Sequence, residues 1–455
     1  MLGIVVSRAD DASVHIGEHL LELADWDRLA DTARPDADGG GVVYRTDGAV
    51  LREFEGLHLS TDRPAEAFEG VDLLVFASKH AGETGPLLTA HHTGNFGPAD
   101  HGGDPNALSR ACPNAHARVM AALNEHAPEG YDAGMECTHH GPTDVGAPSM
   151  FVEVGSGQQE WDDPDAARAV ARAILELRGV SPDCEPENGK GDEGYRRHLV
   201  GVGGGHYAPR FERIVRETGW AVGHVAADWG LDALGDLDSA GSRDVLEAAF
   251  AESRAAYALV DGDRPAVENA VADLGYRAVG ETWVRETDGV PLGLVRAVES
   301  AVATVGEGLR FGDPATGYEG GFSVVVLPAE LIDEARGVDR KATRRALEQV
   351  ALAFGTDQGG TRVTGPAVLT DPADREAILD GLLDVLRERY DSVERADGEA
   401  VARERAFDPG RARTLDVPEG PKFGRLAAGQ SVEVDGREIP PEAVTTERER
   451  RFPLS

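Results

Sequence analysis

Short apolar runs alternate with amphipathic stretches through the first half of this 455-residue chain, and this alternation limits the folds open to it. Buried strands are expected over residues 2–6, 71–77, 134–138, 149–154, 198–202 and 220–226. Helices are expected over residues 13–23, 163–179 and 209–218, with Asp163 and Pro164 well suited to begin the second one. Alternating strands and helices predict an α/β fold: a three-layer sheet with helices on both faces.

The pattern of predicted elements changes in the second half of the chain. Residues 306–320 are glycine-rich and read as a loop, residues 322–327 as a strand, and residues 339–354 and 371–390 as charged amphipathic helices. Length alone favours two or three domains. We therefore expect a catalytic domain over residues 1–280 and a C-terminal α+β extension over residues 281–455.

The net charge of the chain indicates the salt concentration in which it works more than the partner that it binds. Acidic residues number 81 against 45 basic ones, a net charge of −36, and only four of the bases are lysines. Such an excess suits a halophilic protein, because screening lengths fall to about 3 Å in 1 M salt and self-repulsion weakens. The hydrophobic content of 41% argues against a disordered acidic protein.

The cysteines and the first apolar run indicate the compartment of the protein and the redox state of its thiols. Three cysteines without a CxxC pair indicate neither a disulfide framework nor a zinc knuckle. The first apolar run spans residues 2–6 and is far too short for a signal peptide or a membrane span. We expect a cytoplasmic protein with no membrane partner.

Histidine is confined to one half of the chain. All fourteen histidines lie at or before His224, so imidazole chemistry is possible only in the first half. The densest groups lie in three strings at residues 78–92, 136–142 and 201–206. Each string follows a predicted strand, and strand ends can converge on one crevice.

The string Glu136-Cys137-Thr138-His139-His140-Gly141-Pro142 begins at the end of a predicted strand. On a strand, His139 and His140 would face opposite sides, so they can share a site only if the backbone leaves strand geometry, as Gly141-Pro142 permits. The alternative, that one of them merely caps the loop, is equally open.

The glycine run Gly203-Gly204-Gly205 precedes His206 and a predicted helix start. This order offers backbone N–H groups to an anion or a developing oxyanion. It lacks the spacing of the Rossmann and Walker fingerprints. A tight structural turn is the alternative interpretation.

The remaining string supplies Lys79, His80, His91 and His92. Imidazoles with a carboxylate suit zinc, although no segment has HExxH spacing, and a metal-free acid/base site is the rival. Other histidines are expected only to satisfy loop carbonyls: His15, His19, His58, His116 and His126.

Six short strings occur along the chain, namely SKH at 78–80, LTAH at 88–91, ECTHHGP at 136–142, FVEVGS at 151–156, GGGHYAPR at 203–210 and VGH at 222–224. In this order and at these intervals they resemble the archaeal and plant type of D-aminoacyl-tRNA deacylase. The resemblance covers about residues 1 to 280. It implies a zinc-dependent hydrolase for the ester between a D-amino acid and tRNA, a role in translation quality control, and a fold akin to peptidyl-tRNA hydrolase and nucleoside phosphorylases.

With that resemblance, site roles can be assigned. Zn²⁺, as one or two ions, is expected on His91, His139, His140 and His206, lowering the pKa of a bound water toward about 7. Glu136 or Glu153 would accept the proton, and His80 would protonate the leaving ribose oxygen. The amides of Gly203, Gly204 and Gly205 with Lys79 would stabilise the oxyanion.

The expected partner is the acceptor end of aminoacyl-tRNA, with no DNA, bound by a monomer or small homo-oligomer. Its phosphates would meet Lys79, Arg196, Arg197 and Arg210, although ordinary ion pairs are the commoner fate of such arginines. Two other functions stay open. One is a nucleoside phosphorylase-like enzyme with phosphate on the glycine loop, and the other is a non-catalytic RNA-binding protein with a structural zinc.

Overall fold

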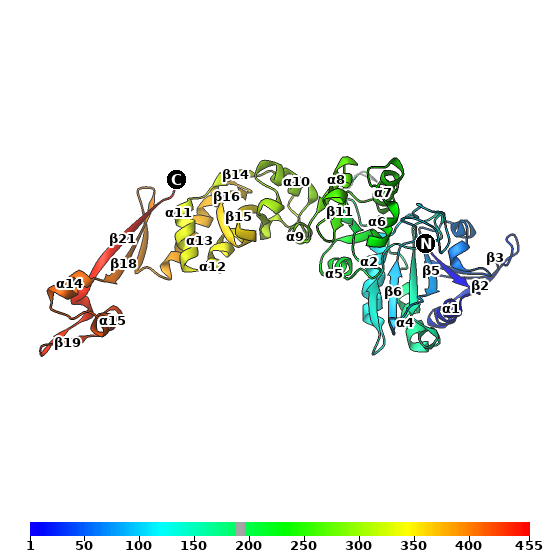
Figure 1. The fold of residues 1–455 in the computed structure, drawn as a ribbon, viewed down its shortest axis with the longest axis horizontal. Helices are drawn as coiled ribbons and strands as arrows, with labels where there is room; N and C mark the ends of the chain where they lie inside the picture. The colour runs from blue at the N-terminus through cyan, green and yellow to red at the C-terminus, as the bar shows by residue number, and fades with distance from the viewer. Residues whose placement is uncertain (188–193, 195) are drawn as a thin grey trace. The chain divides into compact units, whose positions relative to one another are not determined.

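The computed structural model describes residues 1–187, 194 and 196–455 and divides the chain into two compact units, Met1–Asp288 and Gly289–Ser455 (Figure 1). The sequence places its boundary at residue 281, which would assign α9 (Glu281–Glu286) to the extension. In the structure, α9 belongs to the first unit. Its Trp283 packs 5.5 Å from Trp220 and 4.8 Å from Tyr257, measured between ring centres.

The first unit contains an eight-stranded sheet with strands in the order β2, β3, β4, β1, β5, β8, β6, β7. Four neighbouring central strands are parallel, and β6 runs antiparallel to β8. The bounds are β1 Leu2–Ser7, β2 Asp27–Asp31, β3 Asp38–Thr46, β4 Ala49–Phe54, β5 Leu73–Lys79, β6 Leu87–His91, β7 Asp132–Met135 and β8 Ser149–Gly155. Continuous apolar runs form β1 and β5 because parallel strands are buried on both faces.

A second, four-stranded sheet lies in the same unit. It is fully parallel, in the order β10 (Ala221–Ala226), β9 (His198–Val202), β11 (Tyr257–Val260) and β12 (Arg277–Val279). The three histidine strings therefore do not all follow strands of the same sheet. The glycine run follows β9 in the second sheet, whereas His80 and His91 lie at the ends of strands of the first.

Helices α1 (Asp11–Leu23), α2 (Pro113–His126) and α4 (Pro164–Leu175) pack on one face of the large sheet and against one another. Asp163 caps α4 as predicted, its carboxylate accepting from the backbone N–H groups of Asp165 and Ala166. The opposite face packs on the 3-10 helix Pro64–Ala67 and on Val145 and Ala147. The remaining helices of the unit are α3 Gln158–Trp161, α5 Pro209–Glu217, α6 Asp228–Leu234, α7 Ala240–Ser253 and α8 Pro265–Asp273.

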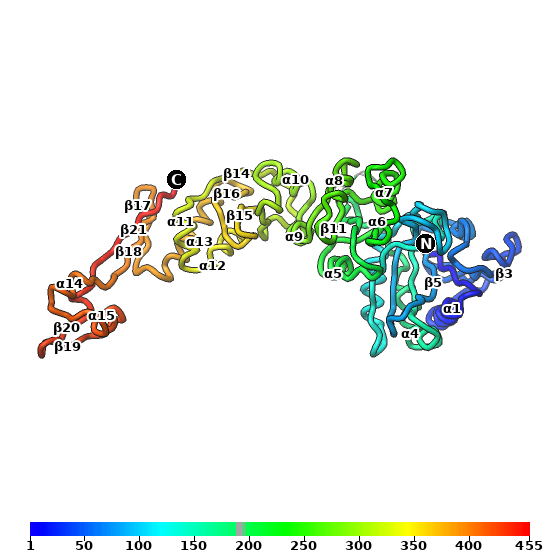
Figure 2. The backbone as a smooth tube through the Cα atoms, viewed as in Figure 1, coloured from blue at the N-terminus to red at the C-terminus, as the bar shows by residue number. Residues whose placement is uncertain are grey.

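The second unit combines an antiparallel sheet with helices and a charged ribbon. The sheet has the order β13 (Leu309–Phe311), β15 (Ala353–Asp357), β16 (Arg362–Leu369), β14 (Ser323–Val326). Its helices are α10 Leu292–Ala301, α11 Ala329–Val338, α12 Arg340–Glu348 and α13 Arg375–Arg387. In Figure 2, β18 (Glu399–Phe407) runs beside β21 (Thr445–Pro453), with β17 (Ser392–Ala396) on its other edge. A small cluster completes the unit: α14 Pro409–Thr414, α15 Pro421–Ala427, β19 Val432–Val434 and β20 Arg437–Ile439.

Two predictions for this unit are wrong in part. The helix predicted over 339–354 ends at Glu348, and Ala353 begins a strand that pairs with β16. The loop predicted over 306–320 contains β13. The chain is a mixed α/β protein, while the three-layer arrangement and the kinship to peptidyl-tRNA hydrolase stay predictions.

Candidate functional site

The site begins on the face of the large sheet that is opposite to α1. Residue pairs Thr89 with Glu153 and His91 with Phe151 lie directly across from each other on β6 and β8. Because side chains alternate along a strand, these four point to the same face. The sheet therefore places one imidazole and one carboxylate side by side in a fully buried position.

The loop after β7 brings in two more imidazoles. Strand β7 ends at Met135, earlier than predicted, and His140 adopts a left-handed backbone with φ 48°. The backbone thus leaves strand geometry, and His139 and His140 face the same site with ring centres 4.4 Å apart. They lie 4.2 and 4.8 Å from the ring of His91.

A short backbone bridge carries His206 to the same place. Glu136 pairs with Tyr207 in an isolated antiparallel bridge, and the N–H of Cys137 donates to the carbonyl of His206 at 2.8 Å. The ring of His206 lies 4.6 Å from that of His139 and 6.1 Å from that of His80. The two sheets of the first unit meet here, and we call His80, His91, His139, His140 and His206 the site histidines.

Three site histidines have their Nδ1 atoms occupied. The Nδ1–H of His91 donates to the carbonyl of His92 at 3.0 Å, that of His139 to Cys137 at 2.8 Å, and that of His140 to Gly141 at 2.9 Å. Their Nε2 atoms are left to bind a ligand, and that of His91 is buried with no hydrogen-bond partner. Carbonyl-bound Nδ1–H groups are the usual second shell of a metal site.

These three rings can hold a metal ion. One ligand atom from each lies within 4.8 Å of the others. Burial lowers the pKa of His140 to about 3 and that of His139 well below its usual range, so both are neutral donors. Burial also disfavours the charged form of His91, but Glu153 and Glu136 raise its pKa overall, so a proton and a metal ion compete for it. The donor set therefore fits zinc.

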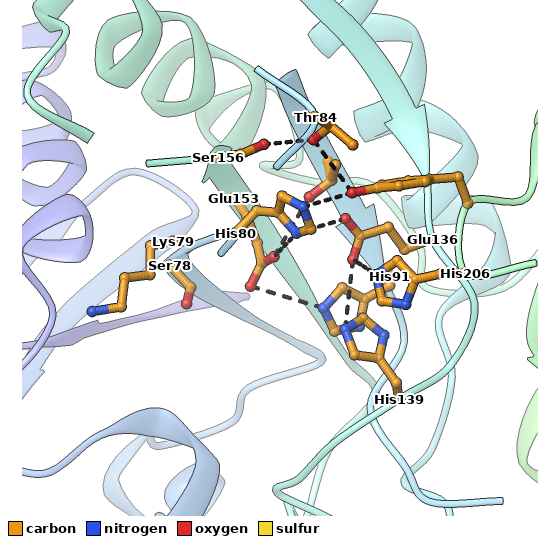
Figure 3. Close-up of polar contacts among 12 residues, drawn as sticks. Ser78, Lys79, His80, Thr84, His91, Glu136, His139, Glu153, Ser156 and His206 are labelled. Carbon is orange, nitrogen blue, oxygen red and sulfur yellow. Dashed lines mark hydrogen bonds and ion pairs between the residues drawn. The ribbon is translucent and has the colours of Figure 1, made fainter. Parts of the chain in front are cut away.

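Two buried carboxylates face four of the site histidines, His80, His91, His139 and His206 (Figure 3). Glu136 lies 2.9 Å from Nδ1 of His80, 3.6 Å from Nε2 of His139 and 3.5 Å from Nε2 of His206. Glu153 lies 3.8 Å from both His91 and His80. Further possible metal-binding groups combine these residues: Cys137, His139 and His206; His80, Glu136 and His206; and His91, Glu136 and Glu153.

The environments of the two carboxylates push their pKa values apart. Burial raises the pKa of Glu153. Burial also acts on Glu136, but the adjacent imidazoles of His206 and His80 hold the pKa of Glu136 well below its usual range. Such a divergence makes Glu153 the more easily protonated of the two carboxylates and Glu136 the one that stays ionised.

A cavity of about 560 Å³ opens onto the site. Its lining includes His80, His139, His140, His206 and Glu153, and it extends to Leu57, Leu59, His101 and Trp229. Sequence reasoning missed Trp229 and Tyr207, whose hydroxyl lies 2.9 Å from Nε2 of His80. Tyr207 adjoins His206 in the GGGHYAPR string, which is the signal that could have identified it.

Other predicted residues lie nearby with different partners. Lys79 lines the cavity, but its side chain extends away from the site histidines in Figure 3, and its Nζ lies 5.0 Å from the ring centre of Trp161. The N–H of Gly203 already donates to the carbonyl of Ala226. A Cβ on Gly204 would lie 3.4 Å from a carboxylate oxygen of Asp261. The glycine loop therefore has an acidic neighbour.

The predicted phosphate-binding arginines are held by the protein itself. Arg210 pairs with Asp261 at 2.5 Å and with Glu281 at 3.4 Å. Arg197 pairs with Glu187 at 2.9 Å, and Arg196 donates to the carbonyl of Cys184. These contacts agree with the alternative given above, in which the arginines make ordinary contacts within the protein and do not bind phosphate.

Histidines set aside by the sequence have structural partners. His15 and His116 contact backbone carbonyls, and His19 and His126 contact Glu22 and Glu176. His58 lines the cavity, yet its Nε2–H donates to the carbonyl of Ala77 at 2.7 Å. A separate buried group, His92, His116 and His224, lies outside the cavity lining, and we call these the scaffold histidines.

Comparisons with known proteins agree with one another. The family model for D-aminoacyl-tRNA deacylase matches residues 67–279. A D-aminoacyl-tRNA deacylase of the halophilic archaeon Haloarcula marismortui is 59% identical over the full length of both chains. One of Methanoregula boonei is 32% identical and covers 99% of this chain and 98% of its own. A crystal structure of a conserved protein of unknown function, 28% identical with a TM-score of 0.53, covers 63% of this chain and 98% of its own.

Proposed function

Because the chain belongs to the D-aminoacyl-tRNA deacylase family, we propose that it hydrolyses the ester joining a D-amino acid to tRNA, releasing free tRNA and the D-amino acid. One observation supports a hydrolytic centre at a defined place. Four imidazoles and the carboxylate of Glu153, from segments distant in sequence, line one cavity, and the buried His91 and Glu136 lie directly behind them. We place the reaction in the cytoplasm, and no helix of the described chain is long and apolar enough to cross a membrane.

Within this proposal, His91, His139 and His140 would hold a zinc ion, and the residues around Glu136 could take a second. When bound, zinc supplies Lewis acidity toward a water and the ester carbonyl. The three Nδ1–H contacts to carbonyls fix the ring orientations before any ion binds.

Glu136 is the base in our assignment. Its pKa lies well below the usual range, so its carboxylate is ionised at neutral pH, and it can accept a proton from the attacking water. Attack of the water oxygen on the ester carbonyl forms a tetrahedral centre. Collapse of that centre breaks the bond to the ribose oxygen.

His80 protonates the departing ribose oxygen in the same scheme. Its Nδ1 faces Glu136 at 2.9 Å and can take the proton that Glu136 accepts from the water. Its Nε2 faces the hydroxyl of Tyr207 at 2.9 Å, and in our scheme the ribose oxygen replaces that hydroxyl and receives the Nε2 proton. Glu153, whose pKa burial raises, is the more easily protonated of the two carboxylates, which limits negative charge in the site. Gly204 and Gly205 stay proposed oxyanion donors, while we reassign Lys79 to a phosphate of the terminal nucleotide.

The nucleoside phosphorylase-like alternative is weaker. Asp261 beside the glycine loop would repel a phosphate, and the relatives are named as deacylases. A non-catalytic RNA-binding role would not require two carboxylates with divergent pKa values among the site histidines.

A comparison of three candidate substrates tests the function directly. The full chain, kept in concentrated KCl, is incubated separately with D-tyrosyl-tRNA, L-tyrosyl-tRNA, and a nucleoside plus phosphate. We expect release of D-tyrosine, slower release of L-tyrosine, and no phosphorolysis. Turnover that survives complete removal of metal would reject the zinc assignment, and phosphorolysis would reject the deacylase assignment.

We also propose that the first unit carries the chemistry and that residues beyond it form an accessory. Truncation should follow Asp288, because ending at residue 280 would remove the buried Trp283 from the first unit. Retained hydrolysis of D-tyrosyl-adenosine by the fragment is the expected result. A folded but inactive fragment would contradict it.

A further inference from the structure

Helix α12 in the second unit carries an unusual concentration of positive charge. Its nine residues include Arg340, Lys341, Arg344 and Arg345 against one acid, Glu348. The whole chain has 81 acids and 45 bases, so the local ratio is reversed. Such a reversal in an acidic protein calls for a physical explanation.

The helix is amphipathic, and its charges lie on one side. Thr343 and Leu347 are buried, and Leu347 belongs to the core shared with α11 and α13. Arg340, Lys341 and Arg345 are exposed. The inward face therefore anchors the helix, and the outward face is cationic.

The exposed cations differ from nearby arginines in their partners. Arg336 and Arg362 both pair with Asp333, and Arg344 pairs with Glu348. Arg340, Lys341 and Arg345 make no ion pair with any other residue that the structure describes. Asp339 attracts Lys341 and Arg345 electrostatically, but it is a single carboxylate that also caps the helix.

Their position in the helix does not favour folding. Arg340 and Lys341 lie in the first turn, where the positive end of the helix dipole repels cations. Asp339 caps this end by accepting from the N–H groups of Lys341 and Ala342 at 2.7 and 2.9 Å. One carboxylate beside three cations leaves the face positive, and an anionic ligand would explain why it is kept so.

We propose that the exposed face of α12, formed by Arg340, Lys341 and Arg345, binds the phosphodiester backbone of the tRNA substrate. This inference rests on the proposed function. Lys341 and Arg345 are one turn apart, about 5–6 Å between their Cβ atoms, a spacing at which two side chains can reach successive phosphates. Phosphate contacts carry no base specificity, which suits an enzyme that acts on many tRNAs. In concentrated salt only such direct contacts persist, because screening removes long-range attraction.

Removal of the three charges provides the test. The full-length variant Arg340→Gln/Lys341→Gln/Arg345→Gln is compared with Arg28→Gln/Arg45→Gln/Arg172→Gln, which removes three exposed charges from the first unit. Dissociation constants for deacylated tRNA are measured by fluorescence anisotropy over a range of KCl concentrations. We expect the α12 variant to bind about tenfold more weakly and to lose about two to three units from the slope of log Kd against log salt, at about 0.9 per phosphate. The matched control should keep both.

Kinetics and a charge-preserving variant complete the test. The α12 variant should raise KM for D-tyrosyl-tRNA with kcat unchanged, and should hydrolyse D-tyrosyl-adenosine, which lacks the tRNA body, like the unaltered protein. Arg340→Lys/Arg345→Lys should bind tRNA normally, and thermal melting checks that each variant folds.

Equal affinity and equal salt slope for the α12 and control variants would overturn the proposal. So would loss of binding to anionic phospholipid vesicles while tRNA binding is unchanged. If the unaltered protein binds tRNA through this face but hydrolyses no D-aminoacyl ester, the deacylase assignment fails and the RNA surface stands.

Discussion

His91 and His92 are neighbours in sequence and both are buried, yet they face different surroundings. His91 points toward Glu153, 3.8 Å from its Nε2, and toward the rings of His139 and His140. His92 points to the other side of the strand, where its Nδ1–H donates to the carbonyl of Gly223 and its ring lies 4.7 Å from His116. Burial alone therefore does not mark a functional histidine.

The difference lies in the groups opposite the rings. Scaffold histidines contact carbonyls, hydroxyls and one another, as when Nε2–H of His224 donates to Ser109 and Thr138 donates to its Nδ1. Thr138 also accepts from the N–H of Val225, so this group ties the site loop to β10. Four of the five site histidines face carboxylates, which can hold or move a proton. One group builds the frame and the other does the proposed chemistry.

The comparison predicts the largest effect at Glu136. Replacement Glu136→Gln removes the carboxylate that serves as the base in our scheme, with almost no change in shape. We expect kcat for D-tyrosyl-tRNA to fall by about 10³-fold, within the range that general bases contribute. Glu176→Gln is the matched control, because Glu176 also pairs with a histidine, His126 at 2.6 Å, outside the site. Comparable losses in both variants would refute the assignment of Glu136.

The adjacent pair gives the sharpest test of the comparison. His91→Asn should lose bound zinc and about 100-fold or more in kcat, because altering even the residues behind metal ligands costs about 10–100-fold. His92→Asn should keep metal and kcat but lose about 1–3 kcal/mol of stability, as expected for a buried polar group left with poorer partners. Metal content, single-turnover rates and chemical unfolding measure all three. Loss of zinc from His92→Asn alone would reverse the roles.

Local sequence patterns predicted much of this architecture. Residues 198–202 form a strand as predicted, and Asp163 caps its helix, because both signals depend on near neighbours. The structure of the segment after Glu348 could not be predicted from near neighbours in the sequence. Its turn into a strand depends on pairing Ala353 with Val368 on β16, a long-range contact that helical periodicity does not report.

The same limit applies to the site. Histidine strings could be found by residue type, and the structure brings His80, His140 and His206 around one cavity. Two other features depend on tertiary packing. One is the sheet that each strand joins, and the other is the hydrogen bond from the N–H of Gly203 to the carbonyl of Ala226. Tyr207 lies in the GGGHYAPR string, but its role depends on the contact of its hydroxyl with His80, which the string does not report.

Acid should lower the stability of the fold by protonating the scaffold histidines. One substitution can isolate the contribution of His116. Burial lowers the pKa of His116 from 6.5 to about 4. The unfolded chain therefore binds this proton at a higher pH than the folded one, so the stability from neutral His116 is complete above pH 6.5 and is lost as pH falls toward 4. The loss is on the order of 3 kcal/mol at pH 4, at about 1.4 kcal/mol per pH unit.

Unfolding by guanidinium chloride at pH 7 and pH 5, at constant high salt, measures this effect. His116→Asn should have lower stability at pH 7 but a smaller decrease between the two values than the unaltered protein. Parallel decreases in both proteins would mean that His116 does not contribute to the acid sensitivity.

The smallest predicted effect concerns the hydroxyl behind His80. Tyr207→Phe keeps the ring and removes the contacts of the hydroxyl, which are 2.9 Å to Nε2 of His80 and a longer 3.4 Å to Oγ1 of Thr84. A hydrogen bond of this kind contributes about 1 kcal/mol, so we expect a decrease of about fivefold in kcat with KM and melting temperature unchanged. Tyr131→Phe is the matched control, since the hydroxyl of Tyr131 donates to Asp163 at 2.9 Å away from the cavity. If Tyr207 only supported the fold, its variant would lower melting temperature and leave kcat per folded molecule unchanged. A kcat effect without a stability effect would identify it as a positioning residue for His80 and extend the site group beyond its imidazoles.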